Sequence, residues 1–137
     1  MNNEVKLSKI VELDLNGYST ETASNKKVYL CLGRSVLRSL AKALDLKEFK
    51  VSINKAGPAV SGDITLIGMW NNGNGIYVAM SEPRLFGMRK GRETFYYRYV
   101  THMKDYGGSG PNKEMTYQQL AEGIDAAAEQ MRWQLGQ

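Results

Sequence analysis

Four segments in the middle of the chain have the apolar patterns of β-strands, and this run constrains the fold more than any other feature. Residues 49–53 alternate apolar with polar side chains, and residues 63–70 are apolar on both faces, as in a central strand. Residues 71–75 are glycine and asparagine, which predicts a β-hairpin with residues 76–80 as the second strand. Residues 94–103 form a long aromatic segment. We therefore expect a mostly antiparallel sheet.

The flanking residues add two predicted strands and two predicted helices. Residues 10–15 alternate, and residues 28–32 are a short apolar run, so we expect a strand in each. Residues 35–46 then repeat their leucines at helical spacing. The last helix begins at Thr116, which forms a capping box with Gln119. The apolar face of this last helix consists of Tyr117, Leu120, Ile124, Ala127, Met131 and Leu135.

These elements predict a single α+β domain over residues 1–137, with the order ββαββββα. The expected architecture is a sheet of about six strands with two helices, of which the C-terminal amphipathic helix packs on the sheet. The chain has 137 residues, which is the size of one domain, and 42% of them are hydrophobic, as in an ordinary globular protein.

Cysteine usage and hydropathy predict where the protein resides. Cys31 is the only cysteine, so no intramolecular disulfide forms, and a reducing, cytoplasmic setting is expected. Its neighbours Leu30 and Leu32 are apolar, which favours a buried, inert thiol. The N-terminus lacks a signal-peptide pattern, and no stretch approaches the roughly 18 apolar residues of a membrane span. We therefore expect no membrane association.

The inventory of reactive side chains argues against an enzyme. His102 is the only histidine, which excludes metal sites of two or more histidines, and a zinc site would need further cysteines. We therefore predict no catalytic residues, no metal and no cofactor. A weaker alternative is a metal-independent, ribonuclease-like hydrolase. In it His102 is the base, Glu93 or Asp105 is the acid, and Arg98 and Lys104 stabilise the phosphate.

Charge is sorted along the chain, which bears on binding partners. Residues 84–104 hold six basic side chains against one acid, whereas residues 105–137 hold five acids against two bases. In the predicted helix Arg34, Arg38 and Lys42 follow one another at intervals of four residues, on the side opposite the leucines. Such like-charge pairs cost a few tenths of a kcal/mol each. The alternative interpretation of this stripe is a merely solvated helix face.

The aromatic strand presents two different faces. Phe95, Tyr97 and Tyr99 are expected to pack on the core, which leaves Tyr96, Arg98 and His102 on the open face. Aromatic rings alternating with cations suit single-stranded nucleic acid, because they offer stacking surface and neutralise phosphates. The structural alternative is a strand stabilised by aromatic cross-strand pairs.

The leading hypothesis is therefore a small, non-enzymatic protein that binds nucleic acid or a nucleotide. It loses most of its weight if Arg34, Arg38, Lys42 and Arg98 do not lie on a common surface. The residues expected to contact nucleic acid or another anion are Arg34, Arg38, Lys42, Arg89, Lys90, Arg92, Tyr96, Arg98, His102 and Lys104.

A second hypothesis comes from the last helix. Helical phase places Trp133 on the acidic side with Glu122 and Glu129, away from the apolar stripe. A tryptophan on a charged face is a good anchor for a protein partner or for self-association. On this hypothesis the chain is an interaction module or an inhibitor of the phage or plasmid type, which blocks a host enzyme by binding it.

Overall fold

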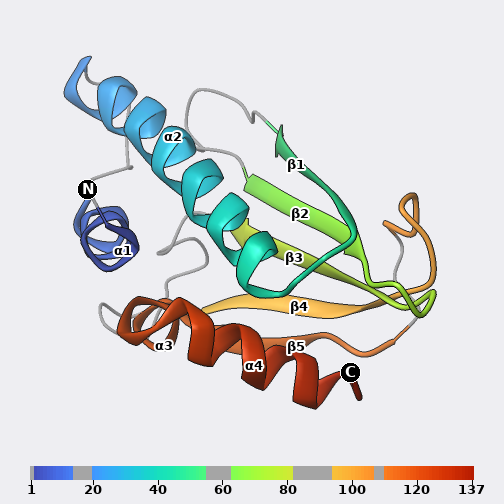
Figure 1. Ribbon diagram of the computed structural model, residues 1–137. Helices are drawn as coiled ribbons and strands as arrows, with labels where there is room; N and C mark the ends of the chain where they lie inside the picture. The colour runs from blue at the N-terminus through green and yellow to red at the C-terminus, as the bar shows by residue number, and fades with distance from the viewer. Residues whose placement is uncertain (1, 14–19, 55–62, 82–93, 107–109) are drawn as a thin grey trace.

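The described residues of the protein form one sheet with the four described helices on one side, as the computed structural model shows (Figure 1). The structure describes residues 2–13, 20–54, 63–81, 94–106 and 110–137. The predicted α+β class is confirmed. The helices are α1 (Asn3–Glu12), α2 (Thr20–Ala43), α3 (Tyr117–Glu122) and α4 (Ile124–Gln134). The strands are β1 (Glu48–Asn54), β2 (Asp63–Met69), β3 (Gly75–Ser81), β4 (Thr94–Val100) and β5 (Lys113–Thr116).

The five strands form an antiparallel meander in which each strand pairs with its neighbour in sequence, in the order β1-β2-β3-β4-β5. The apolar patterns and the predicted turn therefore located four of the strands correctly, and the hairpin between β2 and β3 is confirmed. Its turn is closed by a hydrogen bond from the Trp70 N–H to the Asn74 carbonyl and contains Gly73 at a φ of 83°. That left-handed conformation favours glycine.

The two N-terminal strands of the prediction are wrong, because both segments are helical among the described residues. Residues 10–12 end α1, whose buried Leu7 and Ile10 are three positions apart. Residues 28–32 lie inside α2, where Tyr29 is buried and its hydroxyl donates to the Met80 carbonyl. Short apolar runs fit a strand or one turn of a helix equally well, so the local pattern does not decide between them. The order is thus ααβββββαα.

The predicted start of the C-terminal helix is confirmed, but the helix is not continuous. The Thr116 hydroxyl accepts from the Gln119 N–H at 3.0 Å, and the Gln119 side chain bonds back to the Thr116 N–H, which is the predicted capping box. The helix is then interrupted at Gly123, whose extended backbone separates α3 from α4. The four-residue strand β5 was not predicted, since Met115 is its only apolar residue.

The main core lies between the helices and one face of the sheet. Side chains of all four helices meet the inward residues of the strands there, and the predicted apolar face of the last helix contributes Tyr117, Leu120, Ala127 and Met131. α2 packs on β1 and β2, α4 packs on α2, and α1 fills the space between α2 and α3. Figure 1 shows α2 and α4 side by side on this face. The C-terminal helix is therefore packed on the sheet, as expected.

The opposite face of the sheet carries a second, smaller hydrophobic cluster. It consists of Ile67, Met69, Tyr77, Ala79 and Val100, with Tyr96 and Met103 packed against it. Its members are all at most 8% exposed. The sheet is thus covered in part on both sides, and the outer face of β4 is less open than its sequence predicts.

Candidate functional site

The outer side of α2 presents a row of basic side chains, Lys27, Arg34, Arg38 and Lys42, which we call the α2 stripe. All four are exposed, and none forms an ion pair or a hydrogen bond with another residue that the structure describes. α2 holds five basic residues and one acid. Residues four apart on a helix are separated by about 6 Å along its axis. The α2 stripe is therefore a line of unpaired positive charge that nothing in its described surroundings neutralises.

Lys27 belongs to the α2 stripe but was not predicted, because the expected helix began only at Ser35. The same misplacement explains Cys31, which is exposed on α2 and not buried as expected. In a strand Cys31 would share the apolar setting of Leu30 and Leu32. In the helix Tyr29 points into the core and Cys31 lies on the outer side, close to the α2 stripe in helical phase.

Arg98 lies on the other side of the molecule from the α2 stripe, in the second hydrophobic cluster. Its side chain is 7% exposed, and its guanidinium carbon lies 4.1 Å from the centre of the Tyr77 ring and 5.9 Å from that of Tyr96. One guanidinium nitrogen donates to the Tyr106 carbonyl, while Nε is buried with no hydrogen-bond partner in the described structure. Arg98 and the α2 stripe therefore do not share a surface.

The other predicted residues near β4 are dispersed. Tyr96 is half-buried beside Tyr77, and Lys104 is exposed. His102 is exposed on the turn after β4, where its Nδ1 lies 2.9 Å from the Thr101 hydroxyl. Thr101 in turn donates to the Asp105 carboxylate. Arg98 reaches this turn through its hydrogen bond to the Tyr106 carbonyl, whereas Glu93 lies outside the described residues. The hydrolase hypothesis therefore stays a prediction. Arg89, Lys90 and Arg92 lie outside the described residues.

The environment of Tyr77 makes the stability of the protein depend on pH at the alkaline end. Burial, together with the neighbouring Tyr96, raises the pKa of Tyr77 to about 12, and nearby Arg98 opposes this only in part. Burial raises the pKa of Tyr97 as well. In the unfolded chain the pKa of a tyrosine is about 10. Between these two pH values the unfolded chain loses a proton that the folded protein keeps, which favours unfolding.

We therefore expect the free energy of unfolding to fall as the pH rises from 10 to about 12. Below pH 10 the contribution of Tyr77 to stability is fully present. Urea denaturation at a series of pH values measures the decline, and the Tyr77→Phe variant should show a shallower one because it has no proton to lose. Equal pH dependence in both proteins would contradict the expectation.

Trp133 is 74% exposed on α4, in the position that helical phase predicts. Glu122, Asp125 and Glu129 are exposed as well, so the outward side of the C-terminal helices is acidic. Its function as a partner anchor stays a prediction.

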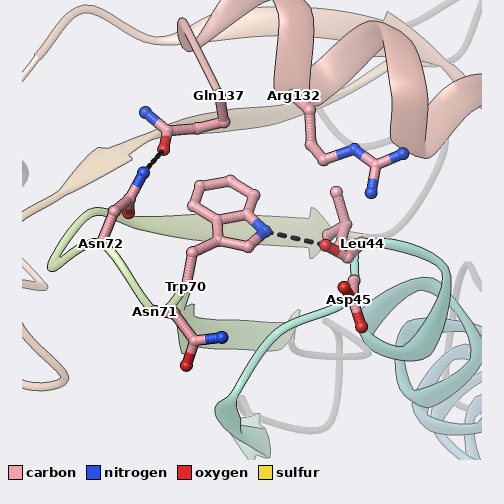
Figure 2. A pocket seen from close by; sticks show the side chains of 7 residues that line it. All are labelled: Leu44, Asp45, Trp70, Asn71, Asn72, Arg132 and Gln137. Carbon is pink, nitrogen blue, oxygen red and sulfur yellow. Dashed lines mark hydrogen bonds between the residues drawn. The ribbon is translucent and has the colours of Figure 1, made fainter.

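A hollow of about 260 Å³ opens where the end of α2, the β2–β3 turn and the end of α4 meet (Figure 2). It is lined by Leu44 and Asp45, by residues 70–72, and by Arg132 and Gln137. The sequence did not point to this site, because its residues come from three distant segments. One signal was available, namely that α2 is followed by Asp45, at a position where helices usually have glycine.

No group of three or more histidine, cysteine, aspartate or glutamate residues is placed to hold a metal ion within the described part of the chain. Among the helices described, none is both long and apolar enough to cross a membrane.

Comparison of the chain with protein-family models, with curated proteins and with solved structures finds no match in any of the three.

Proposed function

We propose that the protein binds nucleic acid through the α2 stripe, without catalysing a reaction. The observation that carries this proposal is the row of four exposed cations on one helix face, none paired with a described residue. Charges of one sign in a row repel one another and gain nothing from their described surroundings. A polyanion removes that repulsion, because each cation neutralises a phosphate and releases a condensed counterion.

The proposal differs from the sequence-based hypothesis in the surface that it uses. The predicted aromatic and basic sheet face had Arg98 at its centre, and a side chain that is 7% exposed offers little to a phosphate. The proposal therefore relies on α2 alone, with Arg34, Arg38 and Lys42 retained from the predicted residues. A long, straight helix with exposed cations contacts the phosphate backbone regardless of base sequence.

The test is a fluorescence titration of a labelled oligothymidylate with the protein at several salt concentrations. For a single strand, four phosphate contacts predict a slope of roughly −3 in a plot of log affinity against log salt. Tight binding at low salt that weakens with this steepness supports the proposal. An absence of binding at low salt, or an affinity insensitive to salt, would overturn it.

The second candidate function, binding of a protein partner or self-association, is favoured by one observation, the 74% exposure of Trp133. Large apolar side chains at this exposure are common anchors of interfaces. Sedimentation of the same protein sample decides between the two candidates. Self-association that disappears in a Trp133→Ala variant, together with no oligonucleotide binding, would favour the second.

A further inference from the structure

The hollow at the end of α2 lies beside the end of the α2 stripe. Lys42 closes the stripe, and Asp45, three residues later, lines the hollow. The hollow has a volume of about 260 Å³ and opens to solvent, which suits a small ligand such as a single ring system. A strand that follows the stripe thus reaches a hollow that can accept a single aromatic heterocycle.

Trp70 provides an aromatic wall that is fixed in place. Its indole N–H donates to the Leu44 carbonyl at 2.7 Å, and the ring also packs against the main core. In Figure 2 the indole stands in the centre of the hollow, with Asn72 and Gln137 on one side and Leu44, Asp45 and Arg132 on the other. A ring held at its N–H edge is a preorganised stacking platform, and aromatic side chains stack on nucleic-acid bases.

One side of the hollow presents a cation and an anion that do not pair. Arg132 extends from α4 toward the end of α2, where Asp45 lies (Figure 2). Neither side chain forms an ion pair or a hydrogen bond with any residue that the structure describes. The opposite side is already engaged, because the Asn72 amide donates to Gln137 at 2.7 Å. The charged groups free to bind a ligand are therefore the Asp45 carboxylate and the Arg132 guanidinium, which lie on the same side of the hollow and do not pair with each other.

The backbone holds Asp45 in an uncommon conformation. The N–H groups of Asp45 and Leu46 bond the carbonyls of Lys42 and Ala41, which is the Schellman pattern that ends α2. Asp45 occupies its left-handed position with a φ of 58°, where glycine is usual. Aspartate tolerates this conformation better than most residues but less well than glycine. The carboxylate is thus kept at the rim of the hollow in spite of a conformational cost.

We infer that the hollow binds an unpaired guanine base, stacked beside Trp70 and read at its edge by Asp45 and Arg132. Guanine presents a carbonyl acceptor next to two N–H donor groups along one edge. A guanidinium donates to the guanine carbonyl oxygen, and a carboxylate accepts from the two N–H groups. The other bases lack two adjacent donors. The inference rests on the proposed function in that the bound strand would be single, with its phosphates on the α2 stripe.

The experiment uses the full chain with Trp133→Phe, so that of the two tryptophans only Trp70 remains. Titration with GMP should quench the Trp70 fluorescence to saturation, and AMP, CMP and UMP should bind at least about tenfold more weakly. Asp45→Asn should weaken GMP binding by about tenfold or more, since one of the two acceptor oxygens facing the guanine N–H groups becomes an NH₂ donor and the negative charge is lost. Asparagine also tolerates the left-handed backbone, so this variant keeps the helix end.

The matched control is Asp125→Asn, which removes an exposed carboxylate from α4 outside the hollow and should leave GMP binding unchanged. Equal quenching by all four nucleotides, an absence of quenching, or no effect of Asp45→Asn would overturn the inference. Comparison of oligothymidylate with the same strand carrying one guanine separates the two proposals. Salt-dependent binding without a guanine preference leaves the α2 stripe standing and removes the guanine site. GMP binding without oligonucleotide binding leaves the guanine site standing and removes nucleic-acid binding by the α2 stripe.

Discussion

Replacing Arg34, Arg38 and Lys42 together with glutamate is expected to lower oligonucleotide affinity by at least about a hundredfold at low salt. Three attractive contacts become repulsive ones, and the counterions that these contacts released stay on the strand. The slope of log affinity against log salt should flatten toward zero for the same reason. Fluorescence anisotropy of a labelled strand measures both quantities.

The fold of this variant should be intact, because the three side chains are exposed and glutamate is a good helix former. The matched control replaces Lys9, Lys50 and Lys104 with glutamate. These lysines are exposed on α1, on β1 and after β4, so the net charge changes by the same amount away from the α2 stripe. An equal loss of affinity in both variants would mean that net charge, and not the stripe, governs binding.

The Gly75→Ala substitution is expected to destabilise the fold by about 2–3 kcal/mol, as overpacked cores do. Gly75 begins β3 and is buried between Met69 and Val100, its partners on the two adjacent strands. A Cβ there would overlap the Gly68 carbonyl oxygen and the Met69 sulfur, and it would lie 2.9 Å from Val100. The carbonyl belongs to the backbone of a central strand, so it cannot move without disturbing the sheet.

Thermal unfolding followed by circular dichroism should show this loss as a fall in Tm of roughly 10 °C. Gly110→Ala is the matched control, since a Cβ at that position meets only the Tyr99 Cβ, at an ordinary 3.7 Å. A Tm for Gly75→Ala within a degree or so of the control would show that the strands separate easily at this point.

The sheet and the last helix were predictable because their signals are local. β1 to β4 each carry an alternating or continuous apolar run, and the β2–β3 turn is rich in glycine and asparagine. The Thr116 capping box needs only four consecutive residues to be recognised. In each case the pattern can be recognised from residues that are neighbours in the sequence.

The N-terminal helices were not predictable in the same way. The alternation of residues 10–15 coincides over its first part with a helical spacing, and the run at residues 28–32 is too short to show a period. Tyr29 settles the question only through its hydrogen bond to Met80, 51 residues away. Tertiary packing therefore decides the structure of a segment whose local pattern is ambiguous.

The candidate sites divide in the same way, into one that a local pattern reveals and others that depend on residues distant in the sequence. The α2 stripe was visible from residue 34 onward, since its spacing is a property of one helix. The burial of Arg98 depends on Tyr77 from the adjacent strand and on Tyr106 beyond the turn, which no local pattern reveals. The hollow depends on Asp45, Trp70 and Arg132, which only the folded chain brings together.

The order of the strands also has a consequence for how the protein folds. Because each strand pairs with the next one along the chain, every pairing in the sheet closes a loop of at most twelve residues, at a modest entropic cost. The contact between α1 and α3 joins opposite ends of the chain, so its closure is the costliest of all. We therefore expect the meander to form early and the contact between α1 and α3 to form last.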